Sequence, residues 1–291
     1  FSTPEHIIDS ATEAMKQGYT KYTSANGFQE LRQAVSKKLK KKNNLEYTDE
    51  EVLITAGCKN AFFTSCASIL NENDEVVLLA PYWVSYPEII NFFRAKINYV
   101  DLSSENNFKL TPEKLRKSLT SKTKMLVFNS PCNPSGCVYK KEELFALAQV
   151  LLEFPDLCII SDDIYEDLIW DQDFYNLPMV EPKLKQQTII VHGFSKSYSM
   201  TGWRIGYAAG PKDTIKRMKT IQAQSVSHAC SISQRAALTA ITSDQKCVSD
   251  MTLAYKERTS YCVKTLQKLS IIKCPDINGS YYAFPDMRKL I

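Results

Sequence analysis

The chain has 291 residues, of which 44% are hydrophobic, so it can bury a large core and can form more than one domain. Its 36 basic and 32 acidic residues give a formal net charge of +4, which is too balanced to indicate nucleic-acid binding and leaves a phosphorylated small ligand open. Nine cysteines without a C-x-x-C pair, and the lack of an apolar run long enough to cross a bilayer, predict a cytoplasmic protein with free thiols that binds no membrane.

Short β-branched runs alternate with amphipathic stretches along most of the chain, a pattern typical of a sheet covered by helices. We expect strands at residues 51–55, 76–80, 97–102, 123–128, 157–162, 188–193 and 204–209. We expect helices from about residue 27 to the basic run 37–42, and then at 60–70, 86–93 and 140–154. Several strands are apolar on both faces, which predicts an α/β fold with a mainly parallel sheet. The basic run is interpreted as a solvated helix end.

The last part of the chain has a different pattern. From Pro211 to about Leu269 the sequence is almost wholly helical. Two short runs, 271–273 and 281–284, then predict the first strands of another unit. We therefore expect a large domain at residues 1–265 and the beginning of a small domain at residues 266–291.

Two loops that follow predicted strands carry informative residues, because ligands gather at the carboxyl ends of parallel strands. Gly57-Cys58-Lys59 lies between a strand and a helix, so its amides could hold a phosphate at the positive helix end, or the glycine could serve the turn alone. Asn133 lies in a loop that two prolines and a glycine fix tightly. This loop either aims the Asn133 amide at a ligand or leaves it bonded only to backbone.

The acidic run at residues 161–167 follows another predicted strand. Asp162, directly at the strand end, is expected to face inward. A solvated acidic helix start suits Asp163, Glu166 and Asp167. A magnesium site around a diphosphate is the alternative, but such a site needs carboxylates on a facing element, and the sequence has no second aspartate-rich motif.

Lys196 is the most informative residue of the chain. The apolar strand 188–191 delivers it into a loop rich in small residues, where desolvation favours the neutral amine over the ammonium. A neutral lysine can attack an aldehyde and form an imine. The competing interpretation is a surface lysine in a polar loop.

Four motifs surround these residues: S-K-x-x-x-M-T-G-W-R-I-G at Lys196, N-x-P-x-N-P-x-G at Asn133, S-D-D-I-Y-E at Asp162 and Tyr165, and A-P-Y-W-V-S-Y-P-E at Trp83. Together they resemble the class I aminotransferases, which depend on pyridoxal 5'-phosphate, over nearly the whole chain. The pieces T-A-G-C-K and P-Y-W-V-S-Y-P look most like the bacterial-type aspartate aminotransferase subgroup. The resemblance implies fold type I, in which a mainly parallel, mixed sheet flanked by helices forms the large cofactor-binding domain.

The resemblance implies a role for each matched residue. Lys196 would carry the cofactor as a Schiff base and shuttle a proton between the substrate Cα and the cofactor C4′. Asp162 would keep the pyridine nitrogen protonated, while Tyr165 and Asn133 would donate to the phenolic oxygen. Trp83 would stack on the ring, and Trp83 and Asn133 would also contact the substrate.

Other matched residues would bind the phosphate and the substrate. Arg204 would pair with the phosphate, joined by the amides of the 57–59 segment. Tyr22 matches a family tyrosine that reaches the phosphate of the neighbouring subunit, so a homodimer is expected. Lys59 matches a lysine that recognises the distal carboxylate of a dicarboxylic substrate.

Two departures from the family pattern stand out. Gly193 occupies a position where many relatives have a phosphate-binding serine, so Ser195 or backbone groups would have to substitute. Family members also begin upstream of Phe1 and continue past Ile291 into a small domain that holds the arginine for the substrate α-carboxylate. We therefore expect this chain to be truncated relative to the family.

The leading hypothesis is transamination between an amino acid and a 2-oxo acid, aspartate with 2-oxoglutarate in the first place. Prephenate or another amino acid as substrate is one alternative. A carbon–sulfur β-lyase on the same fold and cofactor is a second. A truncated, non-catalytic module that binds pyridoxal phosphate is a third.

Overall fold

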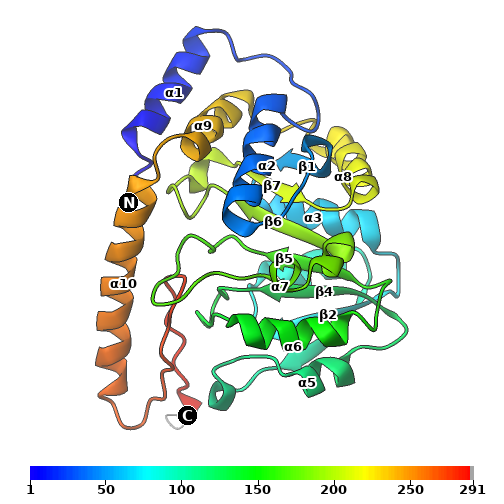
Figure 1. Ribbon diagram of the computed structural model, residues 1–291, viewed down its shortest axis with the longest axis vertical. Coiled ribbons are helices and arrows are strands. Elements are labelled where there is room, and N and C mark those ends of the chain that lie inside the picture. Colours follow the sequence, from blue (N-terminus) through cyan, green and yellow to red (C-terminus); the bar gives the residue numbers. More distant parts are fainter. Residues whose placement is uncertain (289–291) are drawn as a thin grey trace.

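The computed structural model describes residues 1–288, which form a seven-stranded sheet with the strand order β1-β7-β6-β5-β4-β2-β3 (Figure 1). The strands are β1 (Val52–Thr55), β2 (Glu75–Ala80), β3 (Lys96–Asp101), β4 (Thr123–Asn129), β5 (Cys158–Asp162), β6 (Thr188–Gly193) and β7 (Gly206–Ala209). Only β7 runs antiparallel to its neighbours β6 and β1, while the other pairs are parallel. The expected mainly parallel sheet is therefore confirmed.

Helices cover both faces of this sheet. The helices of the described residues are α1 (Glu5–Lys16), α2 (Gln29–Asn43), α3 (Cys58–Ile69), α4 (Ser85–Phe92), α5 (Pro112–Ser118), α6 (Lys141–Leu151), α7 (Leu177–Val180), α8 (Lys212–Ser225), α9 (Ser231–Thr242) and α10 (Lys246–Gln267), and all but α10 belong to these layers or their edges. Alternation along β4 shows the two-sided burial, because Leu126 and Phe128 pack with Leu144 of α6 whereas Met125 and Val127 belong to the core under α3 and α4. Side chains buried on both faces explain why the strands read as continuous apolar runs.

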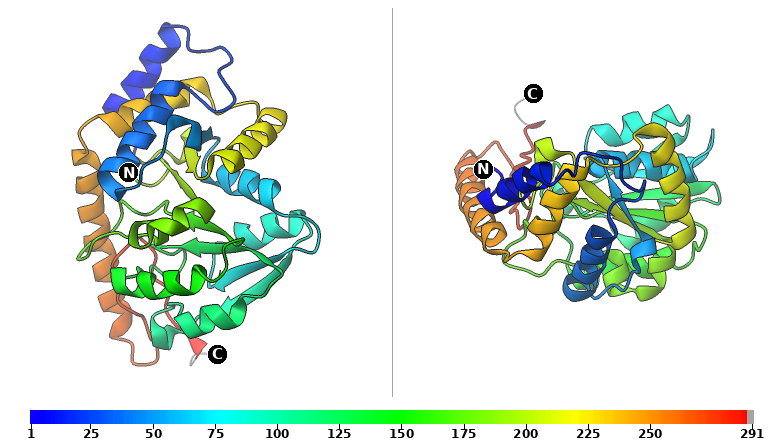
Figure 2. Two further views of the ribbon diagram at one scale, coloured as in Figure 1. Left: turned by 45° about the vertical axis from the view of Figure 1, so that its right-hand side comes forward. Right: turned by 90° about the horizontal axis from the view of Figure 1, so that it is seen from above.

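The helix α10 lies outside these layers. Figure 2 shows α1 and α10 together at one side of the molecule, and the ring of Phe1 packs edge-on against Tyr255 of α10 with centroids 5.4 Å apart. After α10 the chain turns back alongside it, and Val263 of α10 packs with Cys274 and Ile277 (Figure 1).

The strands expected at 271–273 and 281–284 do not form, so that prediction was wrong. Within residues 1–288 this segment makes only isolated bridges, Lys273 with Asp286 and Ile169 with Gly279. Its apolar residues pack against α10 and against Tyr165, and they do not pair with another strand. Buried residues of either kind give an apolar run in the sequence, so the pattern was mistaken for a strand.

Two observations concern the expected free thiols and the possibility of a membrane-spanning helix. All nine cysteines are free. In the part of the chain that the structure describes, none of the helices combines the length and the apolar character needed to cross a bilayer.

Candidate active site

Loops from several strand ends meet around a cavity of about 310 Å³. It is lined by Cys58, Lys59, Trp83, Tyr86, Asn129, Asn133, Asp162, Ile164, Tyr165, Ser195, Lys196, Thr201, Arg204 and Tyr282. All the site residues expected from the sequence line it except Gly57, which lies beside it, and Tyr22. The sheet topology produces this convergence, because β4, β5 and β6 are neighbouring parallel strands that end at the same edge.

Asp162 closes strand β5 and is 5% exposed. The Tyr86 hydroxyl donates to its Oδ2 at 2.6 Å, and the Ile164 amide donates to Oδ1 at 3.3 Å. Burial raises the pKa of the Asp162 carboxyl, while these two hydrogen bonds and the nearby His192 and Lys196 act in the opposite direction. The carboxylate therefore has donors that hold its position without a cation in contact with it.

Asn133 is tied to the same strand end through Asn129, the last residue of β4. The Asn133 amide donates to the Asn129 side-chain oxygen at 2.8 Å, and the Asn129 side-chain amide donates to the Asp162 carbonyl at 2.8 Å. These bonds leave the Asn133 side chain free to line the cavity. The prediction that the loop aims Asn133 inward, and not only at backbone, agrees with this geometry.

Lys196 reaches the cavity from the loop after β6. Its Nζ lies 5.9 Å from the ring centroid of Tyr165 and 5.6 Å from that of Tyr281, so aromatic rings surround the amine. The Tyr165 hydroxyl lies 2.9 Å from that of Tyr282, which fixes the orientation of the first ring. Lys196 is therefore half-buried at the cavity and is not a surface lysine.

Arg204 lines the cavity, and its guanidinium lies beside Gly57, which precedes α3. Its Nη1 donates to the Thr201 carbonyl at 2.9 Å. Gly57, with φ of 85°, lies so close that a Cβ there would come within 2.8 Å of Arg204 Nη2. Glycine is needed for this approach, and it brings the guanidinium next to the first amides of α3. The two together form a site suited to a phosphate.

Gly193 is the last residue of β6, and the close packing around it explains why no serine stands at this position. A Cβ at this position would lie 2.8 Å from Cys58 Sγ and 2.8 Å from the Gly206 Cα. The thiol of Cys58 thus occupies the space that a side chain at position 193 would need. Ser195 and Thr201, both in the connection after β6, line the cavity and could supply a hydroxyl in its place.

Lys59 and Trp83 form a pair at the rim, with the Lys59 Nζ 5.0 Å from the Trp83 ring centroid. Tyr22 behaves differently, since it is 91% exposed and its ring packs only edge-on against His228 at 5.7 Å. Tyr22 does not line the cavity of its own chain.

The charges around the cavity are uncompensated. None of the ion pairs formed within residues 1–288 includes Asp162 or Arg204. A buried carboxylate without a cation costs stability, and a cationic group of a ligand would offset that cost. A ligand with a protonated ring nitrogen, an aldehyde and a phosphate fits Asp162, Lys196 and Arg204 respectively, which is the donor set that pyridoxal phosphate requires.

The rest of the acidic run corrects the sequence interpretation. Glu166 is 1% exposed and Asp163 is 2% exposed, and no helix begins there. Asp163 accepts hydrogen bonds from Ser161 and Asn176 at 2.7 and 2.6 Å. The expected solvated helix start was therefore wrong for these acidic residues.

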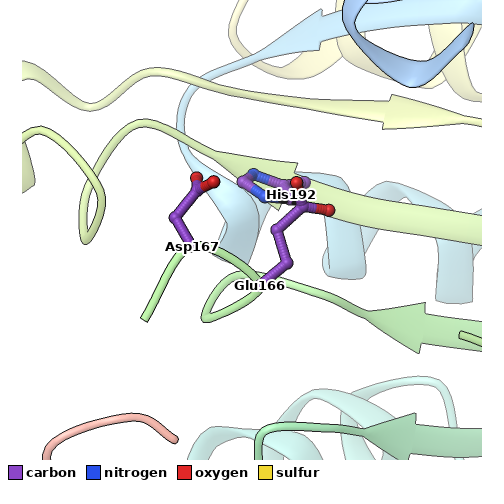
Figure 3. A group of neighbouring side chains, drawn as sticks. All are labelled: Glu166, Asp167 and His192. Carbon is purple, nitrogen blue, oxygen red and sulfur yellow. Dashed lines mark ion pairs between the residues drawn. The ribbon is translucent and has the colours of Figure 1, made fainter. Parts of the chain in front are cut away.

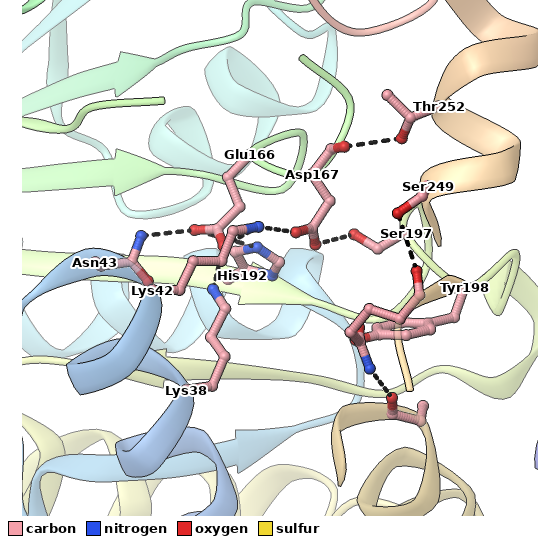
Figure 4. Close-up of polar contacts among 12 residues, drawn as sticks. Lys38, Lys42, Asn43, Glu166, Asp167, His192, Ser197, Tyr198, Ser249 and Thr252 are labelled. Carbon is pink, nitrogen blue, oxygen red and sulfur yellow. Dashed lines mark hydrogen bonds and ion pairs between the residues drawn. The ribbon is translucent and has the colours of Figure 1, made fainter. Parts of the chain in front are cut away.

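Glu166 and Asp167 belong to a buried ion cluster with two lysines of α2 (Figure 4). Glu166 pairs with Lys38 and with Lys42, the latter at 3.3 Å, and Asp167 pairs with Lys42. Burial alone would raise the pKa of Glu166, but Lys38, His192 and Lys42 hold it well below its ordinary value. Lys38, whose side chain is 16% exposed, thus faces inward, and the interpretation of the basic run as a solvated helix end was wrong for it. The Lys42 side chain remains 40% exposed.

Figure 3 shows Glu166, Asp167 and His192 with ligand atoms that lie within 4.8 Å of one another, a spacing that would suit a metal ion. The Lys38 and Lys42 ammonium groups already neutralise both carboxylates, however. The Gly193 amide donates to His192 Nδ1 at 2.6 Å, and Nε2 lies 3.6 Å from Glu166 Oε2. The cluster is therefore an ion-pair network, and the magnesium alternative gains no support.

Sequence reasoning missed five residues that line the cavity: Tyr86, Asn129, Ile164, Thr201 and Tyr282. Four of them had a positional signal, because they stand in the motifs around Trp83, Asn133, Asp162 and Lys196. Asn129 also directly follows the strand expected at 123–128. Tyr282 had none, because its contact with Tyr165 joins residues far apart in the chain.

Comparisons with known proteins agree with this geometry. The family model described as "Aminotransferase class I and II" matches residues 1–290. An aspartate/prephenate aminotransferase of Nitrosomonas europaea is 43% identical over 100% of this chain and 74% of its own length. An aspartate aminotransferase of Bacillus subtilis is 41% identical over 99% of this chain and 74% of its own length. The crystal structure of an aspartate aminotransferase from Rhizobium meliloti superposes with a TM-score of 0.98 at 36% identity, covering 100% of this chain and 73% of that one.

Proposed function

Because this chain belongs to the aminotransferase class I and II family, it is a pyridoxal-phosphate-dependent transferase of amino groups, and we propose that aspartate and 2-oxoglutarate are its preferred substrates. The observation that carries the substrate proposal is the position of Lys59 at the cavity rim, 5.0 Å from the Trp83 ring. An ammonium there can bind the second carboxylate of a dicarboxylic acid. The names of the relatives, aspartate aminotransferase and aspartate/prephenate aminotransferase, point the same way.

The cofactor would be held at both ends of the cavity. Asp162 would pair with the ring nitrogen, and Arg204 with the Gly57 and Cys58 amides would bind the phosphate. When bound, pyridoxal phosphate supplies a ring that accepts the electrons released as a proton leaves the substrate Cα.

The surrounding residues would bind and orient the reactants. The Lys196 amine would take the Cα proton and return it, because it is the basic side chain among aromatic rings at the centre of the cavity. Asn133 and Tyr165 would donate hydrogen bonds to the ring oxygen. Trp83 would cover the ring face and exclude water.

Prephenate is a second candidate acceptor, because the Nitrosomonas europaea relative is named an aspartate/prephenate aminotransferase. Prephenate also carries two carboxylates, so Lys59 would serve both substrates. A comparison of kcat/KM for aspartate with that for alanine, and of 2-oxoglutarate with prephenate as the acceptor, separates these possibilities. Equal kcat/KM values for aspartate and alanine would contradict the role of Lys59.

We also propose a homodimer. Tyr22 is a large aromatic side chain that is 91% exposed, and its position outside the cavity of its own chain suits a contact with the phosphate site of a second copy. Residues 1–265 would form the cofactor-binding domain and 266–291 the beginning of a smaller one. Nine free cysteines support a reducing compartment such as the cytoplasm.

The site is tested with a Lys196→Ala variant, for which we expect transamination to fall by at least about 10³-fold, since one amine serves both as attachment point and as proton carrier. Borohydride reduction of the wild-type protein should leave a phosphopyridoxyl group on Lys196, detected by peptide mass spectrometry. The exposed Lys183 provides the matched control, and Lys183→Ala should retain full activity. A label on another lysine would refute the assignment.

A further inference from the structure

Cys132 and Cys137 face each other across the loop that follows β4. The Cys132 amide donates to the Cys137 carbonyl at 3.0 Å, and the Gly136 amide donates to the Cys132 carbonyl at 2.8 Å, so the loop closes on itself. This single backbone bond joins the amide of one cysteine to the carbonyl of the other, so their Cα atoms lie no more than about 7 Å apart. Disulfides typically span about 5.5–6 Å between Cα atoms. Both thiols also line one small cavity of about 20 Å³.

The two thiols differ in reactivity. Cys132 is half-buried, and the hydrogen bond from Cys137, helped by Ser135, lowers the pKa of its thiol in spite of burial. The pKa of the Cys137 thiol is raised well above its ordinary value, first by the hydrogen bond to Cys132 and then by burial. Burial also raises the pKa of the buried Cys66 and the half-buried Cys158. Of this pair, Cys132 is therefore the thiol that more readily gives the nucleophilic thiolate.

We propose that Cys132 and Cys137 form a reversible disulfide that shuts down this enzyme when peroxide is present. The Cys132 thiolate attacks one oxygen of hydrogen peroxide, the O–O bond breaks, and the leaving hydroxide takes up the thiol proton as water, which leaves a sulfenic acid. The Cys137 sulfur then attacks the Cys132 sulfur, the S–O bond breaks, and the hydroxide leaves with the Cys137 proton as a second water. Two thiols are oxidised to one disulfide, and one peroxide is reduced to two waters.

The disulfide would displace residues of the active-site cavity, because Cys132 directly precedes Asn133. The Asn133 amide is bonded to Asn129 at 2.8 Å, and Asn129 is bonded to the Asp162 carbonyl at 2.8 Å. A covalent link that draws Cys132 toward Cys137 pulls on this chain of bonds. A shift of about 1 Å in a residue that positions reactants costs activity on the order of 10²-fold.

The other side of the loop transmits the same change. A Cβ at Gly136 would lie 2.7 Å from the Ile277 side chain and 2.9 Å from the Tyr282 carbonyl, so loop and C-terminal segment are in close contact. Tyr282 in turn lies 2.9 Å from the Tyr165 hydroxyl. Movement of the loop would therefore be passed on to residues of the active-site cavity.

The experiment treats the purified holoenzyme with hydrogen peroxide, removes the peroxide with catalase and measures transamination before and after dithiothreitol. We expect a loss on the order of 10- to 100-fold that dithiothreitol reverses. Trypsin cleaves after Lys124 and Lys140, so both cysteines lie in one peptide, residues 125–140. Without reduction, this peptide should be lighter by two hydrogen atoms and should resist alkylation.

Variants separate the disulfide from other damage, each compared with its own untreated activity. Cys132→Ser should resist peroxide, whereas Cys137→Ser should be inactivated in a way that dithiothreitol no longer reverses, because the sulfenic acid is oxidised further. Cys230→Ser removes an exposed thiol and should behave as wild type. Inactivation of Cys132→Ser at the wild-type rate, or a disulfide that forms without loss of activity, would overturn the proposal. The peptide mass is independent of the substrate, so the choice of aspartate or prephenate does not affect this outcome.

Discussion

Asp162 and Glu166 are buried carboxylates of the same acidic run, yet their surroundings are opposite. Asp162 receives hydrogen bonds from Tyr86 and Ile164, and burial raises its pKa. Glu166 lies among Lys38, Lys42 and His192, which lower its pKa well below the ordinary value despite burial. A carboxylate that its own chain neutralises stabilises the fold, whereas one left without a cation is available to a cationic ligand.

The largest expected effect is on activity when Asp162 is replaced. Asp162→Asn keeps the shape and the bond from Tyr86 but removes the charge, so we expect kcat/KM at saturating cofactor to fall on the order of 10²–10³-fold. The urea midpoint of the cofactor-free protein should not fall, because burial of the charge is a cost in the folded state. A variant that loses stability while keeping its activity would reverse the roles that we assign to the two carboxylates.

Replacement of Glu166 should act on stability. Glu166→Gln leaves the Lys38 ammonium buried without its partner, and we expect the free energy of unfolding to fall by about 3–5 kcal/mol in urea titrations. The exposed pair of Glu46 with Lys40, at 2.7 Å, supplies the control, and Glu46→Gln should leave the urea midpoint unchanged. If both variants unfold at the same urea concentration, the buried ion pairs of Glu166 contribute no more to the free energy of unfolding than the exposed pair does.

The smallest effect is a dependence of stability on pH. The pKa of Glu166 is lower in the folded chain than its ordinary value of 4.5, so its contribution is present above that value and is lost as the pH falls. The difference in unfolding free energy between wild type and Glu166→Gln should therefore shrink below about pH 5. Asp163, whose burial raises its pKa to about 8, acts in the opposite direction, and Glu166 contributes to that rise, so both proteins should carry Asp163→Asn in this measurement. A constant difference down to about pH 3 would contradict the assignment.

Much of the cavity could be predicted because parallel strands end at one edge. Asp162 and Lys196 follow apolar strands, and the order of those strands in the sheet brings them together whatever the intervening sequence does. The motifs around these residues also indicated the aminotransferase family. Tyr22 and its expected partner subunit stay a prediction, since a single chain cannot present that contact.

The charge balance could not be predicted. Lys38 and Lys42 lie on α2, far from Glu166 in the sequence, and a helix with lysines at its end looks the same whether they face water or a buried carboxylate. The C-terminal apolar run posed a similar problem, because packing against α10 and pairing in a sheet both require buried side chains. In both cases the deciding contacts join residues that are far apart in the chain, and a local sequence pattern does not reveal them.

The reversal of direction between β6 and β7 places Lys196 and Arg204 on a single connection, anchored where Gly193 pairs with Gly206. An insertion or deletion in that connection would displace the amine and the guanidinium together, whereas a length change after β3 would touch neither. In chimaeras built with segments of relatives, the β6–β7 hairpin should accordingly be exchanged as one block together with the beginning of α3, whose Cys58 thiol lies against Gly193.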